Sequence, residues 1–175
     1  EVYWDITPAE LLQRMKKESN RFWTGKRKKQ AEVLGLSLEE VITLASIVEQ
    51  ETIYAPEKST VAGMYLNRLR RGMLLQADPT VKFALKDFQL RRILHKHLAV
   101  ESPYNTYLYP GLPPGPICVP SIQSIDAVLN AATHNYIYMC AKEDFSGSHN
   151  FATNYAQHQR NARKYAAALN AKKIK

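Results

Sequence analysis

The chain has few cysteines, no long apolar run and no internal repeat. Its 175 residues include two cysteines, Cys118 and Cys140, and neither has a metal-binding neighbour at ligand spacing. This excludes a disulfide framework and a cysteine-based zinc site. The two thiols are either bridged or free, and we expect them to be free because Cys140 ends an apolar, strand-like run. No apolar run approaches the roughly 20 residues that a membrane-spanning helix needs.

Acidic residues are scarce beside basic ones: 24 Lys and Arg against 16 Asp and Glu give a net charge of +8. Such a charge favours an anionic partner, whether nucleic acid, a membrane surface or an acidic polymer. An apolar fraction of 45% and an aromatic fraction of 10% are typical of a globular protein. The length suits one domain with a sizeable core. Because the chain begins with Glu rather than Met, we expect it to be a piece of a longer protein.

Capping signals and apolar periodicity predict an α+β fold that is mostly helical. A small β-hairpin and a long Pro-rich cleft loop complete it. Residues 101–120 contain six prolines and two glycines, which predicts a loop too long for a mere connector. Residues 1–6 look strand-like, residues 24–34 look like a basic linker, and 87–100 allow one short helix. The predicted helices are 8–23, 38–52, 57–71, 79–85 (with Asp78 as N-cap), 121–132 and a last helix to 171 capped by Thr153. The predicted strands of the hairpin are 136–141 and 148–152.

The helix predicted at 38–52 is the most informative stretch. Ser37 and Glu40 form a capping-box signal, and the helix is apolar on nearly every side, which predicts burial. Glu49 follows Ala45 and Ile42 at helical spacing, close to the negative end of the helix dipole. Desolvation on this apolar face and the helix dipole would both raise the pKa of Glu49 and suit it to general acid catalysis. Alternatively, Glu49 and its neighbour Glu51 simply cap a surface turn beside Lys58.

Several polar and aromatic residues elsewhere could line a cleft. Tyr, Asn, Gln and His are the side chains that stack on sugar rings and bind their hydroxyl and amide groups. Each alone has an ordinary explanation, such as helix capping for Asp78, packing for the tyrosines and a surface position for His149. Together they predict a glycan-binding site formed by Gln76, Asp78, Tyr104, Asn105, Tyr107 and His149.

Six short motifs follow one another between about residue 30 and residue 169. They are Ala45-Ser-Ile-Val-Glu49-Gln-Glu51-Thr52, Asn67-Arg-Leu69, Met73-Leu-Leu-Gln76-Ala-Asp78-Pro-Thr80, Tyr104-Asn-Thr-Tyr107, Gly111-Leu-Pro-Pro-Gly-Pro-Ile117 and His149-Asn-Phe151. In these motifs, their order and their spacing, the sequence resembles the YceG-like family of endolytic murein transglycosylases. The chain departs from the common pattern at Val119-Pro-Ser121, where many members have Asn-Pro-Gly.

The resemblance implies a single-pass protein of the bacterial inner membrane, with its catalytic domain on the periplasmic side. The implied substrate is the glycan strand of nascent peptidoglycan, and cell-wall synthesis enzymes are candidate partners. Neither a metal, a cofactor nor nucleic acid is expected. We expect residues 7–175 to be the catalytic domain, with residues 1–6 a remnant of a preceding LysM-like domain. The membrane would be reached only through an anchor outside this chain.

The family's catalytic acid maps onto Glu49. The implied reaction uses one carboxylate twice, as acid and then as base, and leaves a 1,6-anhydro-N-acetylmuramic acid end. Glu51 cannot be its catalytic partner, since residues two apart on a helix point about 200° away from each other. We therefore expect a structural role for Glu51, such as holding Arg68.

Two other functions remain open. In a glycan hydrolase, Asp78 would act together with Glu49, and the products would have reducing ends. A basic nucleic-acid-binding domain would need lysines on one face with interleaved aromatic residues. The lysines instead gather near the two ends of the sequence.

Overall fold

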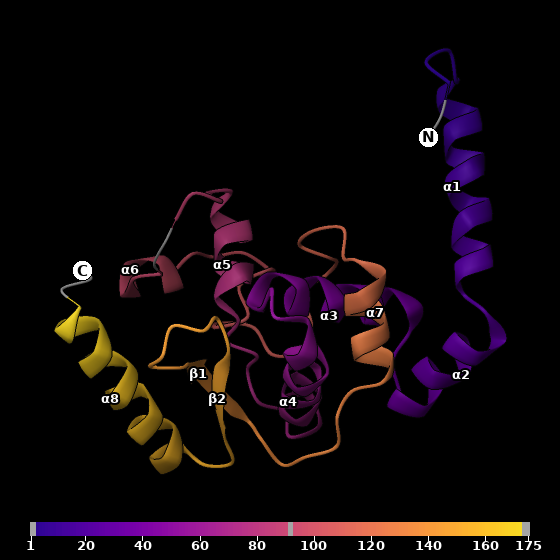
Figure 1. The fold of residues 1–175 in the computed structure, drawn as a ribbon. Coiled ribbons are helices and arrows are strands. Elements are labelled where there is room, and N and C mark those ends of the chain that lie inside the picture. Colours follow the sequence, from indigo (N-terminus) through magenta and orange to yellow (C-terminus); the bar gives the residue numbers. More distant parts are fainter. Residues whose placement is uncertain (1–2, 91–92, 173–175) are drawn as a thin grey trace.

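The structure is a computed structural model that describes residues 3–90 and 93–172. Helices dominate it, and the only sheet within these residues is a two-stranded hairpin. The central helices are α3 (Leu38–Glu51), α4 (Lys58–Arg70) and α7 (Ile122–Leu129), which pack against one another (Figure 1). The predicted α+β class is therefore confirmed.

Helix α1 (Pro8–Phe22) begins where the sequence predicted. Thr7 and Glu10 cap it reciprocally and Pro8 occupies its first position. None of its residues is buried, and it stands away from the central helices (Figure 1). Residues 3–6 form a turn rather than the predicted strand, and residues 1–2 lie outside the described part of the chain.

The basic linker predicted at 24–34 is wrong, because these residues form helix α2 (Gly25–Leu34). Thr24 caps its start, and Gly35 ends it in the left-handed conformation, at φ 72°. The Arg27 guanidinium contacts both carboxylate oxygens of Asp126 on α7, at 3.0 and 3.1 Å. The helix has almost no apolar face, so its caps and this ion pair hold it where hydrophobic periodicity gave no signal.

Helix α3 supplies the centre of the core, and its predicted capping box between Ser37 and Glu40 is present. Seven of its eight residues from Val41 to Val48 are buried, and two of these, Thr43 and Ser46, are polar. The short helix η1 (Ala55–Glu57) joins α3 to α4. On α4, a Cβ added to Gly63 would lie only 2.3 Å from the Ala132 carbonyl oxygen, so the chain passes very close to the helix there.

Helix α5 (Asp78–Leu85) begins one residue before the predicted start, so Asp78 is not its N-cap. The N-cap is Ala77, and Asp78 instead binds Tyr107. Helix α6 (His95–Leu98) is the short helix expected within 87–100. The Pro-rich loop that follows is docked on the start of α5, because Thr106 Oγ1 accepts from Ala77 N at 3.0 Å and its carbonyl accepts from Gln76 N at 3.0 Å.

The hairpin and the last helix form the other side of the molecule. Strands β1 (Tyr138–Ala141) and β2 (His149–Ala152) are antiparallel, with Ala141 opposite His149. Helix α8 (Tyr155–Ala171) packs on this hairpin. Asn154, not Thr153, is its N-cap, and Tyr155 at its start is 59% exposed. Helix α7 is also shorter than predicted, ending at Leu129.

Both cysteines are free, as the sequence predicted. Within residues 3–90 and 93–172, no helix combines the length and the apolar character needed to cross a bilayer.

Candidate active site

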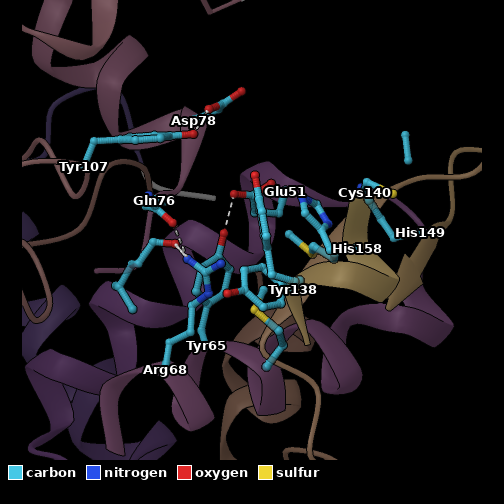
Figure 2. Close-up of a pocket in the computed structure, with 15 residues that line it drawn as sticks. Glu51, Tyr65, Arg68, Gln76, Asp78, Tyr107, Tyr138, Cys140, His149 and His158 are labelled. Atoms are coloured by element: carbon cyan, nitrogen blue, oxygen red, sulfur yellow. Dashed lines mark hydrogen bonds between the residues drawn. The ribbon is translucent and has the colours of Figure 1, made fainter. Parts of the chain in front are cut away.

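A pocket of about 400 Å³ lies between the central helices and the hairpin. Helices α3 and α4 form its inner wall, the segment 75–78 and the Pro-rich loop form one side, and β1, β2 and α8 form the other. Figure 2 shows that its polar side chains converge from these separate elements. The residues that carry its chemistry are Glu51, Tyr65, Arg68, Gln76, Asp78, Tyr107, Tyr138, His149, Tyr155 and His158.

Glu51, at the end of α3, is the acid on the inner wall of this pocket. Its carboxyl oxygen accepts a hydrogen bond of 2.5 Å from the Tyr65 hydroxyl on α4 (Figure 2). Burial raises the pKa of Glu51 to about 7, although the Tyr65 hydrogen bond works in the opposite direction. The nearby Asp78 carboxylate adds to the rise. Glu51 therefore exchanges its proton near neutral pH, as a general acid must.

Glu49 does not line the pocket, and its predicted raised pKa is wrong. Its Oε2 atom accepts from the hydroxyl groups of Ser121 and Ser124, from Ser121 N at 3.2 Å and from Lys58 Nζ at 3.1 Å. Burial opposes ionisation, but these hydrogen bonds outweigh it and lower the pKa of Glu49 to about 2. Ser121 is the N-cap of α7, so Glu49 faces the positive end of that helix. Its carboxylate ties α3, α4 and α7 together.

Arg68 supports the pocket from behind. Its guanidinium donates to the carbonyl oxygens of Leu74, Leu75 and Ile137 at 2.6–3.0 Å, and to Gln76 Oε1 at 3.1 Å. These bonds hold Gln76 at φ 51°, a left-handed conformation that side chains other than glycine rarely adopt. The predicted site residue Gln76 is therefore fixed at the pocket. The Arg68 N–H groups in these bonds hold the protein backbone and Gln76 rather than a ligand.

The Pro-rich loop contributes one of its three predicted residues to the pocket. The Tyr107 hydroxyl donates to Asp78 Oδ1 at 2.5 Å, and both side chains line the pocket. Burial and the Asp78 carboxylate raise the pKa of Tyr107, so its hydroxyl keeps its proton. The same two residues border a smaller neighbouring hollow beside α6, which extends the concave surface.

Tyr104 and Asn105 lie outside the pocket. The ring of Tyr104 packs against Phe83, with centroids 4.7 Å apart. Asn105 is fully buried and donates to the carbonyl oxygens of Leu98 and Val100 at 2.9 and 2.8 Å. Both residues shape the loop that positions Tyr107.

The hairpin and α8 provide an aromatic wall. The rings of Tyr138 and His158 stack with centroids 5.1 Å apart, and Tyr155 lies beside them. Burial, together with the charge of Arg68, lowers the pKa of His158, so its ring is neutral at pH 7. The predicted site residue His149 lies on the same side, where its Nδ1 atom is 2.6 Å from a Glu57 carboxylate oxygen. A flat aromatic surface opposite polar groups is suited to a sugar ring.

No cluster of three or more potential metal ligands occurs in the described ranges 3–90 and 93–172. The pocket combines an acid of raised pKa with hydrogen-bonding and aromatic side chains.

Sequence reasoning missed several pocket residues, Glu51 foremost. Tyr65 lies within the apolar stripe of α4, where an aromatic side chain is usually part of the core. A signal was nevertheless present, since Tyr65 and Arg68 are three residues apart and share one helix face. Tyr138, Tyr155 and His158 gave no usable signal, because only the packing of α8 on the hairpin brings them to the pocket.

Comparisons with known proteins agree with this architecture. The model of the YceG-like family matches residues 1–164. The endolytic murein transglycosylase of Bacillus subtilis is 32% identical over 168 residues, which are 96% of this chain and 46% of that protein. The endolytic murein transglycosylase of Streptococcus pneumoniae is 30% identical over 156 residues, 87% of this chain and 27% of that protein. The chain thus spans less than half the length of these curated relatives.

A solved structure gives the same result for the fold. The crystal structure of a yceG-like protein from Listeria monocytogenes superimposes with a TM-score of 0.79 at 30% sequence identity, covering 91% of this chain and 51% of that one. The family match over most of the chain and the shared fold lead to one conclusion. This chain belongs to the YceG-like family.

Proposed function

We propose that this chain is the catalytic domain of an endolytic peptidoglycan transglycosylase, with Glu51 rather than Glu49 as its catalytic acid. The observation that carries the proposal is the pair of opposite environments of these two glutamates. Glu51 lies in the pocket with a pKa raised to about 7, whereas Glu49 is bound as a carboxylate outside it. The names of the relatives supply the substrate class.

In the proposed reaction, protonated Glu51 donates to the oxygen that links N-acetylmuramic acid to N-acetylglucosamine. The bond from that oxygen to the anomeric carbon breaks, and the released sugar keeps the proton as a hydroxyl. The Glu51 carboxylate then accepts the proton of the muramyl 6-hydroxyl, and the oxygen of that hydroxyl attacks the anomeric carbon. A 1,6-anhydro end forms without water, and Glu51 is again protonated.

The surroundings of Glu51 suit both halves of this cycle. In the acid half, burial keeps the proton on the carboxyl group. In the base half, the Tyr65 hydroxyl is placed to stabilise the carboxylate by donating at 2.5 Å. Gln76, Tyr107 and the Tyr138–His158 pair then bind and orient the glycan around the reacting bond.

Peptidoglycan lies outside the cytoplasm, so we propose that the domain acts there. We propose further that it is held at the periplasmic side of the inner membrane by an anchor outside this chain. Cell-wall synthesis enzymes are the proposed protein partners, because the strands cleaved are newly made.

A two-carboxylate hydrolase is the second candidate, because Asp78 lines the same pocket as Glu51. Asp78 would then activate water or attack the anomeric carbon. Mass spectrometry of digested peptidoglycan separates the two mechanisms. We expect 1,6-anhydro ends from the wild-type protein, and reducing ends would favour the hydrolase.

The assignment of the acid is tested by the matched variants Glu51→Gln and Glu49→Gln. We expect Glu51→Gln to lose cleavage by about 100-fold to 10,000-fold, the usual contribution of general acid–base catalysis. Glu49→Gln should keep cleavage wherever it remains folded, as judged by circular dichroism. An active Glu51→Gln protein beside a folded, inactive Glu49→Gln protein would return the role to Glu49.

A further inference from the structure

Glu57 is a buried carboxylate whose two oxygens both bind one residue of the pocket. It lies in η1, between α3 and α4, and is 7% exposed. Its Oε2 atom accepts from the backbone N–H of His149 at 2.8 Å, and its Oε1 atom is 2.6 Å from His149 Nδ1. These two residues are 92 positions apart in the sequence, so the contact fixes the start of β2 against η1.

The pair of bonds determines which nitrogen of His149 carries the proton. A carboxylate only accepts hydrogen bonds, so Nδ1 must be the donor. In neutral His149, Nε2 then carries a lone pair and becomes an acceptor. Among the described residues, no hydrogen-bond partner is recorded for Nε2, and His149 lines the pocket.

We propose that Glu57 is a positioning residue that holds His149 with Nε2 as a hydrogen-bond acceptor for a hydroxyl or amide N–H group of the glycan. This inference rests on the proposed function, since it names how that site recognises its substrate. Glu57 itself does not line the pocket, so it acts only through His149.

The variant Glu57→Gln gives a sharp test because an amide has only one acceptor oxygen. The backbone N–H of His149 can only donate, so it claims that oxygen. The amide NH₂ group then faces Nδ1 and requires it to be an acceptor. The proton moves to Nε2, and the pocket-facing nitrogen changes from acceptor to donor.

Nitrogen-15 NMR of the histidine side chains, recorded without substrate in mildly alkaline buffer, reports this change directly. We expect protonated Nδ1 in the wild-type protein and protonated Nε2 in Glu57→Gln, with assignment by comparison with His149→Ala. Protonated Nε2 in the wild-type protein would overturn the proposal. This readout needs no reaction, so it stays informative even if the proposed transglycosylase activity fails.

Activity provides the second readout. We expect Glu57→Gln to lower kcat/KM by about 10-fold to 100-fold at unchanged thermal stability, the range for leaving a desolvated polar group mispaired. The change should have no further effect in a His149→Ala background, because Glu57 acts through that residue. Additive losses, or unchanged kcat/KM in Glu57→Gln alone, would contradict the positioning role.

Glu143→Gln is the matched control. The Glu143 carboxylate accepts from Asn150 Nδ2 at 2.8 Å, so it contacts the residue beside His149 on β2 without lining the pocket. We expect its tautomer spectrum and its kcat/KM to match those of the wild-type protein. A loss equal to that of Glu57→Gln would show that general loosening of the hairpin, not the state of His149, controls activity.

Discussion

Glu49 and Glu51 lie two positions apart on α3, yet their carboxyl groups are in opposite environments. Glu49 reaches the N-terminus of α7 and the Lys58 ammonium, which favour its charged form. Glu51 is placed on the inner wall of the pocket, where burial favours its neutral form. The helix itself does not make the two environments different. The difference comes from the elements that pack against each face of α3, and these elements come from distant parts of the sequence.

This difference predicts opposite effects of pH on stability. The pKa of Glu51 is raised from 4.5 to about 7, so the folded state binds the proton more tightly than the unfolded state does. Stability from this group is present below pH 4.5 and is lost as the pH rises to about 7. We therefore expect Glu51→Gln, which cannot ionise, to have a higher Tm than the wild-type protein in alkaline buffer. Calorimetry across pH measures this, and a lower Tm there would contradict it.

Glu49 should behave in the reverse way. Its pKa is lowered from 4.5 to about 2, so its contribution is present above pH 4.5 and is lost as the pH falls to about 2. Replacing it by Gln leaves the buried Lys58 without its counter-charge. We expect a loss of about 1–3 kcal/mol at neutral pH, measured by urea unfolding. An equal Tm for wild-type and Glu49→Gln proteins at neutral pH would show that the ion pair adds no stability.

At the scale of elements, α4 depends on its close approach to the segment after α7. Gly63 has no room for a side chain, because an added Cβ would meet the Ala132 carbonyl oxygen at 2.3 Å and His134 Nε2 at 2.8 Å. We expect Gly63→Ala to destabilise the fold by about 1–3 kcal/mol through overpacking. The control is Gly25→Ala at the start of α2, where nothing lies within 4 Å of the added atom. Urea unfolding that ranked the control as the less stable variant would contradict this account.

The sequence predicted those elements whose local signals agree with their packing. The capping box at Ser37 predicted the start of α3, and Pro8 predicted the start of α1. The apolar stripe of α4 predicted that helix. Helix α2 was missed because its stability comes from caps and from the Arg27–Asp126 contact, not from an apolar face. Asp78 carried a capping signal, but its carboxylate is used by Tyr107 instead.

For the candidate pocket, four of the six predicted glycan-binding residues lie together. Gln76, Asp78, Tyr107 and His149 do line one pocket. The proposed choice of Glu51 over Glu49 was not accessible from the sequence, because it rests on where Ser121 and Tyr65 lie relative to α3. Residue types predict the kind of chemistry, but only tertiary contacts set the protonation state that the chemistry needs.

At the scale of the whole molecule, two groups of exposed basic residues lie on helices at opposite ends. Helix α1 with Lys16 and Lys17 stands at one end, and α8 with Arg160 and Arg163 borders the pocket side at the other (Figure 1). These four side chains are exposed. Because salt screens exposed charges beyond about 10 Å at 0.1 M, of these two groups the charges on α8 should attract an anionic strand to the pocket more strongly.

We therefore expect Arg160→Glu/Arg163→Glu to lower kcat/KM for peptidoglycan at low salt, by about 10-fold, and to remove most of its salt dependence. The matched variant Lys16→Glu/Lys17→Glu changes the net charge equally but should leave the rate within about twofold, since α1 stands at the opposite end of the molecule from α8 (Figure 1). The value of kcat should stay constant in both, because the charges act on encounter rather than on the reacting bond. Equal losses in the two variants would mean that net charge, not the basic face of α8, governs capture of the strand.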